Sequence, residues 1–182
     1  MKTLIILTIY LFVSCTQLAH QTDDIRQGQQ QKVVRSKNGV VTTAHPLATN
    51  AGIEILESGG NAMDAAGAAA FTLSVVEPSM SGIGGRAQIL IYTPEQEVHG
   101  IDATTQAPAY YEFDDTAGVE YGYQTIAVPG VVKGLTDGLA DFGDLHLEQV
   151  MKPAILYAQR GFALLPGAVS YTHLTLPTSD LV

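Results

Sequence analysis

The stretch 65–76 constrains the fold of this chain more than any other feature, because its residues are apolar or small on every face. A helix of that composition must be covered on all sides by other elements, and its small residues let neighbouring backbones approach closely. The apolar run is too short to cross a bilayer. Asn61 is placed to cap the helix, Asp64 lies near its positive end, and Glu77-Pro78 ends it. We therefore predict a buried helix at the centre of the core.

Further elements are predicted on both sides of that helix. Hydrophobic periodicity and turn residues indicate strands over 40–43, 87–92, 98–102 and 123–128, and helices over 46–56, 131–142 and 147–160. The two middle strands are expected to form a hairpin, residues 79–86 a glycine-rich loop, and 110–120 an irregular acidic segment. We expect His45 to cap or pack. This order fits a layered α+β or α/β fold, without the strict strand–helix alternation of a doubly wound nucleotide-binding domain.

Both ends of the chain are predicted to lie outside this core, which we place at residues 38–168. Residues 1–15 are typical of a lipoprotein-type signal peptide with Cys15 as the lipidated residue, although an ordinary cleaved signal with an incidental cysteine would look similar. Residues 16–37 are polar and glutamine-rich, as in a tether. Residues 169–182 resemble a translated sequencing adapter, so we interpret them as a scar; a native C-terminal strand is the alternative.

Charge and residue types exclude several classes of function. The net charge of −9 argues against nucleic acid as a partner, because phosphate binding needs a basic face. A single cysteine cannot form an internal disulfide, and the histidines His45, His99 and His146 are far apart in the sequence. We therefore expect no metal site. Membrane association is expected only through the lipid anchor, which would leave an exported protein in the periplasm or on the outer membrane.

The glycine-rich loop is the first candidate binding element. Gly82, Gly84 and Gly85 offer unhindered backbone N–H groups, and Arg86 is the only Arg or Lys between residues 37 and 133. N–H groups beside a cation can hold a carboxylate or an oxyanion. A tight turn that needs glycine geometry, and a salt bridge from Arg86 to an acid such as Asp102, remain as structural alternatives.

The end of the second hairpin strand is the other candidate. Asp102 is followed there by Thr104, Thr105 and Gln106, which are uncharged polar side chains. Such a cluster can line a polar pocket or can satisfy backbone groups of a loop.

Ordered segments of this sequence resemble the opening of the large subunit of gamma-glutamyltranspeptidases. They are residues 39–48, 59–66, 76–78 and 81–85, then Ala107-Pro108, 128–130, 153–155 and Gly161-Phe162. The resemblance covers about residues 38–165. It implies an incomplete N-terminal nucleophile hydrolase fold (αββα), in which two sheets lie between helix layers, and it implies no metal or organic cofactor.

The resemblance also implies a reaction. Members of this family are proenzymes that cleave themselves to expose a threonine, which attacks the gamma-glutamyl amide of glutathione or a related small molecule; water or an acceptor amino acid then resolves the acyl-enzyme. That threonine belongs to the small-subunit part, beyond residue 182, so the fragment should be inactive alone and poorly soluble. A related acylase or amidase with a different donor, and a non-catalytic surface-binding lipoprotein of the same fold, are the alternatives.

One segment departs from the family pattern Asp-x-Arg-Glu-x-Ala-Pro. In residues 102–108, Thr104 stands at the arginine position and Thr105 at the acid position, while Arg86 stands where the family often has glycine. In the family that arginine grips the substrate's alpha-carboxylate. Our hypothesis is that Arg86 supplies the missing cation, which makes Arg86, Thr104 and Thr105 the candidate substrate-binding residues.

Overall fold

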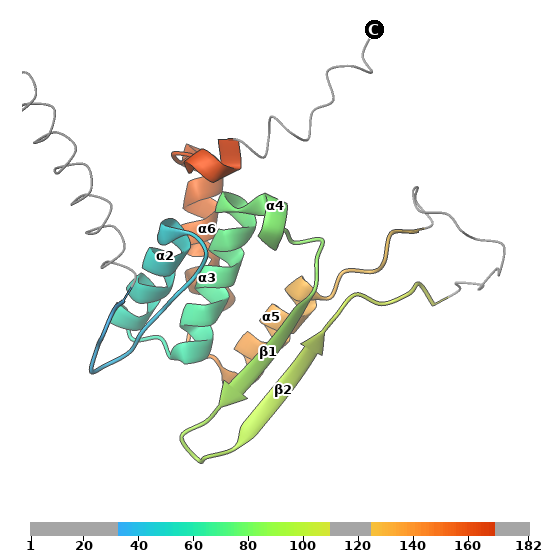
Figure 1. Cartoon of the computed structure of the whole chain (residues 1–182). Helices are drawn as coiled ribbons and strands as arrows, with labels where there is room; N and C mark the ends of the chain where they lie inside the picture. The colour runs from blue at the N-terminus through green and yellow to red at the C-terminus, as the bar shows by residue number, and fades with distance from the viewer. Residues whose placement is uncertain (1–32, 110–124, 170–182) are drawn as a thin grey trace, which may run out of the picture. The chain divides into compact units, whose positions relative to one another are not determined.

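The computed structural model describes residues 33–109 and 125–169. In chain order the elements are α2 (Pro46–Glu57), α3 (Ala62–Val76), α4 (Pro78–Ser81), β1 (Ala87–Tyr92), β2 (Val98–Ala103), α5 (Val131–Phe142) and α6 (Leu147–Arg160) (Figure 1). The chain divides into the units Met1–Val40 and Val41–Val182, and every contact described below lies within the second. The predicted signal segment with Cys15, the acidic segment 110–120 and nearly all of the C-terminal tail lie outside the described residues.

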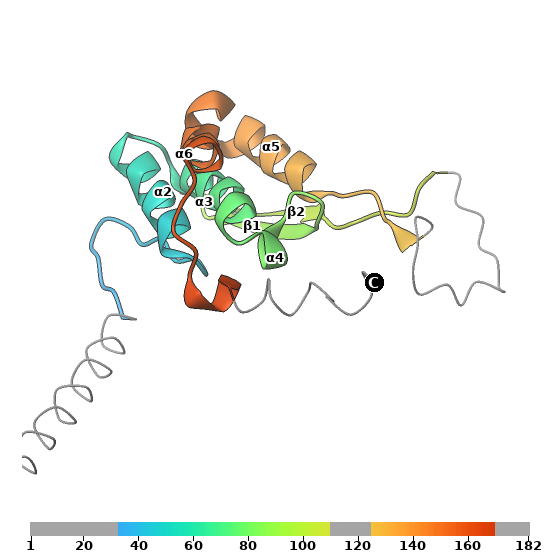
Figure 2. The same cartoon turned by 90° about the horizontal axis from the view of Figure 1, so that it is seen from above.

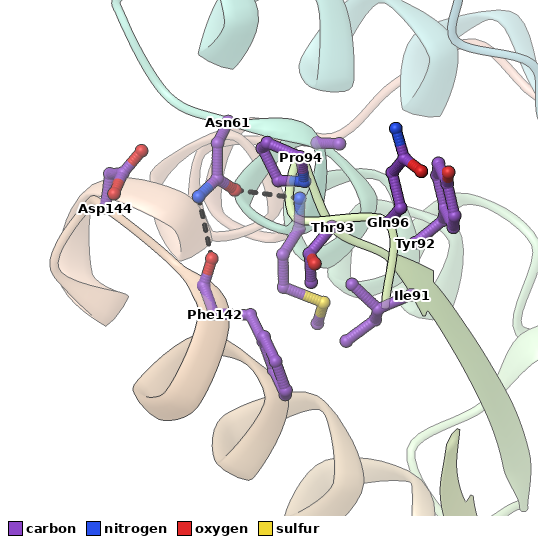
Figure 3. Close-up of a pocket in the computed structure, with 10 residues that line it drawn as sticks. Asn61, Ile91, Tyr92, Thr93, Pro94, Gln96, Phe142 and Asp144 are labelled. Atoms are coloured by element: carbon purple, nitrogen blue, oxygen red, sulfur yellow. Dashed lines mark hydrogen bonds between the residues drawn. The ribbon is translucent and has the colours of Figure 1, made fainter. Parts of the chain in front are cut away.

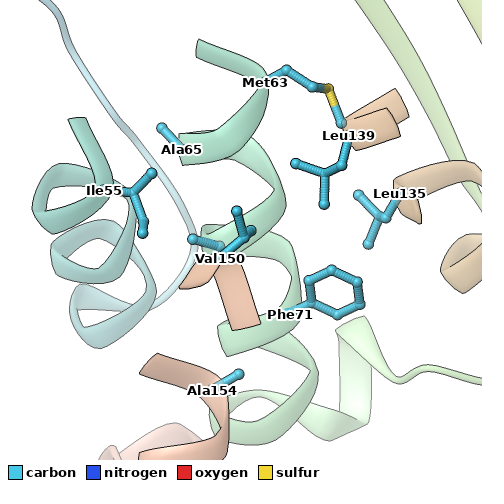
Figure 4. Close-up of a cluster of buried hydrophobic side chains, with 9 residues drawn as sticks. Ile55, Met63, Ala65, Phe71, Leu135, Leu139, Val150 and Ala154 are labelled. Atoms are coloured by element: carbon cyan, nitrogen blue, oxygen red, sulfur yellow. The ribbon is translucent and has the colours of Figure 1, made fainter. Parts of the chain in front are cut away.

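Helix α3 is the central element of the core, as its composition predicts. Both α2 and α6 pack against it, and α5 adds side chains from a third direction (Figure 4). The shared cluster consists of Ile55, Met63, Ala65, Ala68, Phe71, Leu135, Leu139, Val150 and Ala154. Glycine makes the close approach possible, because a Cβ on Gly52 of α2 would lie 3.1 Å from the carbonyl oxygen of Ala65. The other elements do not cover α3 completely, because Ala62 and Ala66 on one edge of the helix are exposed.

The N-terminus of α3 is closed by a capping box. The Asn61 side-chain oxygen accepts hydrogen bonds from the N–H groups of Met63 (2.8 Å) and Asp64 (3.1 Å), and Asp64 Oδ2 accepts from the Asn61 N–H (2.9 Å). This exchange satisfies donors that a helix start otherwise leaves without partners. The predicted cap is therefore confirmed.

The same two side chains also bind the connection between α5 and α6. The Asp64 carboxylate accepts from the N–H groups of Asp144 (3.0 Å) and Leu145 (3.3 Å), and Asn61 Nδ2 donates to the Phe142 carbonyl (2.7 Å). Asp64 is fully buried, so these backbone donors replace water around its charge. The start of α3 thus fixes a loop about 80 residues later in the chain.

Strands β1 and β2 form an antiparallel hairpin whose register runs from Ala87 opposite Ala103 to Tyr92 opposite Val98. The odd-numbered residues face α5, which covers one side of the hairpin (Figure 2). The even-numbered residues are exposed, and among them Leu90 and Tyr92 are apolar or aromatic. The predicted hairpin is confirmed, with β2 one residue longer than expected.

Three predicted features differ from the structure. Residues 40–43 form no strand, because no neighbouring strand lies beside them among the described residues. Residues 79–81 belong to α4, since Pro78 occupies its first turn, so the glycine-rich loop is shortened to 82–86. Of the predicted strand 123–128, the described residues 125–128 supply only one bridge, from Val128 to Gln106, and a single bridge is too short for a strand.

The predicted ranges of α2, α5 and α6 are confirmed, with α2 one residue longer than expected. α2 ends at Glu57, and Gly59 follows with a φ of 92°, a left-handed conformation that glycine adopts without strain. His45 caps α2, because its Nδ1 accepts from the Leu47 N–H at 3.2 Å, and its ring packs edge-on against Phe162. No helix in the described part of the chain is long and apolar enough to span a membrane.

Candidate functional site

The glycine-rich loop is held against the start of α5. The Gly85 N–H donates to the Gly82 carbonyl (3.3 Å), and the Gly85 carbonyl accepts from the N–H groups of Gly130 (3.2 Å) and Val131 (3.4 Å). None of the loop glycines has a positive φ. The backbone angles of this loop therefore do not require glycine. The hydrogen bonds to the Gly85 carbonyl fix the position of the backbone just before Arg86.

The end of β2 lies against the same helix start. A Cβ on Gly130 would lie 2.5 Å from the carbonyl oxygens of both Ala103 and Thr104, so only glycine fits at this position. The bridge between Gln106 and Val128 continues this contact beyond the strand. The loop before β1, the end of β2 and the start of α5 thus meet at one end of the hairpin, which we call the polar end.

The polar end brings together two of the three predicted substrate-binding residues. Ala87 and Ala103 are the last pair of the hairpin, so Arg86 and Thr104 directly adjoin this pair on the two strands. Arg86 is exposed and forms no ion pair in the part of the chain that the structure describes. Asp102, the proposed salt-bridge partner, instead accepts from the Thr104 N–H at 3.2 Å. Within the described ranges, Arg86 therefore has no salt bridge to Asp102 or to another acid.

A cavity of about 260 Å³ opens beside Thr104, between β2 and α5. Asp102, Gln106, Lys133 and Asp137 supply its polar lining, whereas Arg86 and Thr105 are not among the lining residues. Sequence reasoning missed Lys133 and Asp137, whose charged groups pair at 2.6 Å one helical turn apart. The signal was present, because an i,i+4 pair of opposite charge stands just after Pro129-Gly130.

A larger cavity, of about 680 Å³, lies at the other end of the hairpin (Figure 3). Its walls are the start of α3, the hairpin turn and the end of α5, with the side chains of Met63, Ile91 and Phe142 among the lining. Its lining includes no Ser, Cys, His, Lys or Arg. Thr93 and Asp144 are part of this lining, but no cation is. The smaller cavity at the polar end includes Lys133, so we keep it as the candidate site for an anionic ligand although it is the smaller of the two.

The histidines do not gather at either cavity. His45 caps α2, and His99 lies 3.4 Å from the Glu97 carboxylate with its ring 4.9 Å from that of Phe142. The N–H of His146 donates to the Gln149 side chain at the start of α6. Among the described residues, no group of three His, Cys, Asp or Glu side chains is arranged to hold a metal ion.

Comparison with known proteins places these features in a family. The family model described as gamma-glutamyltranspeptidase matches residues 48–177. The glutathione hydrolase proenzyme of Bacillus subtilis (strain 168) is 37% identical over 147 residues, covering 75% of this chain and 25% of the relative. The Acylase ACY 1 proenzyme of Pseudomonas sp. (strain SE83) is 40% identical over 154 residues, covering 75% of this chain and 27% of the relative.

Solved structures agree with the sequence comparison. The crystal structure of Helicobacter pylori gamma-glutamyltranspeptidase matches with a TM-score of 0.72 at 32% identity, covering 78% of this chain and 43% of that chain. The predicted N-terminal nucleophile hydrolase fold is thereby confirmed, with partial coverage. The chain spans about a quarter of the length of the curated relatives it matches. The family model covers more than half of the chain, and this chain therefore belongs to the gamma-glutamyltranspeptidase family.

Proposed function

We propose that this chain is the N-terminal part of an exported proenzyme that hydrolyses or transfers gamma-glutamyl groups, with glutathione as the model donor. The observation that carries the proposal is the family membership, together with 37% identity to a glutathione hydrolase proenzyme. In this proposal self-cleavage exposes a threonine in the small-subunit part, outside these 182 residues. The chain alone is then inactive.

The chemistry follows from an activated threonine. Its hydroxyl oxygen attacks the amide carbonyl, the new N-terminal amine takes the hydroxyl proton, and the amine of the donor leaves with a proton. Water or an amino acid then attacks the resulting ester and releases the threonine. No metal or organic cofactor enters these steps. The backbone N–H groups of Gly82 and Gly84 are our candidates for binding a carboxylate or oxyanion near the donor, because the Gly85 N–H donates to the Gly82 carbonyl.

A second candidate function is an acylase or amidase with a different donor. Two observations favour it: Thr104 replaces the arginine that the family pattern carries, and the acylase proenzyme is 40% identical. A site without a cation at this position would accept an acyl group that lacks the alpha-carboxylate. The two functions therefore differ in donor and share the nucleophile.

Expression of the complete gene separates these functions. We expect the purified protein to appear as two chains by mass spectrometry, with a threonine at the new N-terminus, and to release p-nitroaniline from gamma-glutamyl-p-nitroanilide. Faster release from butyryl-p-nitroanilide, which lacks both the alpha-amino group and the alpha-carboxylate, would favour the acylase. A single uncleaved chain with no activity on either donor would contradict both and favour a non-catalytic surface lipoprotein.

We also propose the division of the chain into a lipoprotein signal (1–15), a tether (16–37), the core (38–168) and an adapter-derived tail (169–182). The family match runs to residue 177, so sequencing of the genomic locus across position 168 is the direct test of the tail. For the anchor, Cys15→Ser should abolish labelling by radioactive palmitate and release the protein into the soluble periplasmic fraction. Undiminished labelling would contradict lipidation at Cys15.

A further inference from the structure

We propose that the larger cavity, at the turn end of the hairpin, binds a small organic cation that carries an ammonium group on an apolar or aromatic body. The cavity volume of about 680 Å³ lies in the range of binding sites for small molecules. Its walls come from the start of α3, the turn between β1 and β2, and the end of α5, which are far apart in the sequence (Figure 3). This inference adds a binding site to the proposed function, and binding rather than turnover tests it.

Apolar and aromatic side chains supply the surface for the body of the ligand. Met63, Ile91 and Phe142 line the cavity, and Tyr92 adds a second aromatic ring that is 68% exposed. The Phe142 ring lies 4.9 Å from the ring of His99, so a neighbouring ring holds this wall in place before a ligand binds. Aromatic rings and a methionine sulfur make favourable contacts with an apolar or aromatic group. The cavity therefore suits a ligand whose body is a ring or a short hydrocarbon chain.

The charges at this cavity favour a cation. Asp144 carries the only charged side chain in the lining, and the ion pairs of the described residues do not include it. The residues directly next to the lining in the sequence include no Lys or Arg, and their charged members are Asp64, Glu95, Glu97 and Asp141. A cavity lined by one sign of charge concentrates ligands of the opposite sign. An anionic ligand would meet like charge here, whereas an ammonium group can pair with Asp144.

The position of Asp144 is fixed through its backbone, which leaves its side chain for a ligand. Its N–H donates to Asp64 Oδ2 at 3.0 Å, and the residue itself is exposed. The neighbouring Asn61 amide is already used, because its oxygen caps α3 and its Nδ2 donates to the Phe142 carbonyl. Figure 3 shows Asp144 and Asn61 at one end of the cavity and Tyr92 at the other. The ammonium group therefore binds at the Asp144 end, and the body extends along the cavity towards Tyr92.

The first test is isothermal titration calorimetry of the complete proenzyme with phenethylamine. Phenethyl alcohol and hydrocinnamate share its body and end in a neutral hydroxyl and a carboxylate. We expect the amine to bind about threefold to fivefold more tightly than the alcohol, the strength of an exposed ion pair, and the carboxylate to bind least. Asp144→Asn should lower the affinity for the amine to that for the alcohol and leave the alcohol unchanged. Glu148→Gln, an exposed acid on α6 outside the lining, is the matched control and should keep the preference for the amine.

The second test fills the cavity from its edge. Ala62, the first residue of α3, is exposed and lines the cavity. Ala62→Phe should abolish measurable binding of both the amine and the alcohol, because the new ring takes the place of the ligand body. Ala66→Phe lies one turn further along the same helix, is exposed and is outside the lining, so it should bind both probes like the wild type. Thermal unfolding of the two variants shows whether both keep the fold.

The outcomes separate this inference from the proposed function. The inference is wrong if the wild-type proenzyme binds none of the probes, which would mean that another part of the proenzyme fills the cavity. It is also wrong if the amine and the alcohol bind equally, or if Asp144→Asn or a folded Ala62→Phe variant leaves binding of the amine unchanged. Cleavage of gamma-glutamyl-p-nitroanilide by the same preparation would still support the proposed function. Amine binding with the expected dependence on Asp144 and Ala62, but without cleavage of any gamma-glutamyl donor, would support the site and contradict the proposed function.

Discussion

Two glycine-containing motifs of this chain look alike in sequence and differ in what they leave free. The motif of residues 59–64 places Asn61 and a fully buried Asp64 at the start of α3, and both side chains bind backbone groups nearby and in the α5–α6 connection. The motif of residues 81–86 ends in Arg86, which is exposed and has no charged partner among the described residues. The hydrogen bonds and charges of the two motifs, rather than their glycines, separate a motif whose side chains hold the fold from one whose cation has no charged partner among the described residues.

Removal of the carboxylate of Asp64 should have the largest effect on stability. Asp64→Ala leaves the N–H groups of Asn61, Asp144 and Leu145 without their acceptor, and we expect it to lower the free energy of unfolding by about 3–5 kcal/mol. Urea denaturation of the complete protein measures this. Glu54→Ala, on the exposed face of α2, is the control. A loss no greater than that of the control would mean that the first motif does not hold the fold.

A methyl group at Gly130 should have the next largest effect, and it tests how the second motif is anchored. The added Cβ meets two carbonyl oxygens at 2.5 Å, so Gly130→Ala should push α5 away from β2 and cost about 1–3 kcal/mol. Gly84 has open space around it and no positive φ, so Gly84→Ala should change stability by less than about 0.5 kcal/mol. Equal effects of the two substitutions in thermal unfolding would contradict the proposed anchor.

Thr72 lies in the buried helix α3 but, unlike Asp64, has an unsatisfied polar group, so its replacement by an apolar residue should raise the stability of the fold. Its hydroxyl is buried without a hydrogen-bond partner, and the residue is fully inaccessible to solvent. Thr72→Val removes this unsatisfied group with little change of shape and should raise the free energy of unfolding by up to about 1 kcal/mol. A loss of stability in thermal unfolding would indicate a buried water bound to that hydroxyl.

The ion pair beside the polar end should contribute least. Lys133 and Asp137 lie on the surface of α5, with side-chain exposures of 79% and 48%. Lys133→Ala should change stability by less than about 0.5 kcal/mol, and the difference should shrink further in high salt. Unfolding in low and high salt measures both. A larger, salt-resistant loss would show that this end of the hairpin also serves to hold the fold.

Most helices could be predicted from the sequence because their signals are local. Asn61 with Asp64, Pro46 before an apolar stripe, and the glycines after α5 and α6 each act within one or two turns. The strand predicted at residues 40–43 failed for the opposite reason, because a strand needs a partner, and none is present among the described residues. β-branched residues favour the extended backbone of a strand, but they cannot supply the neighbouring strand that it must pair with.

The candidate site was predictable in composition but not in arrangement. The unusual isolation of Arg86 is visible in the sequence, and so is the polar run that contains Thr104. That the two residues adjoin the last pair of the hairpin follows only from its register, and the close approach of β2 to α5 depends on the missing side chain of Gly130. Thr105 is half-buried and lines neither described cavity, so its part in the site stays a prediction.

The distance along the chain between Asp64 and its distant partners has a consequence for biosynthesis. The carboxylate and the N–H of Asp144 are separated by 80 residues, which a ribosome adds in roughly 4–16 seconds. Until then water solvates the Asp64 carboxylate, and the apolar faces of α3 that α5 and α6 later cover stay exposed. The nascent chain therefore passes through an interval of seconds in which its most apolar helix lacks two of the elements that cover it in the folded protein.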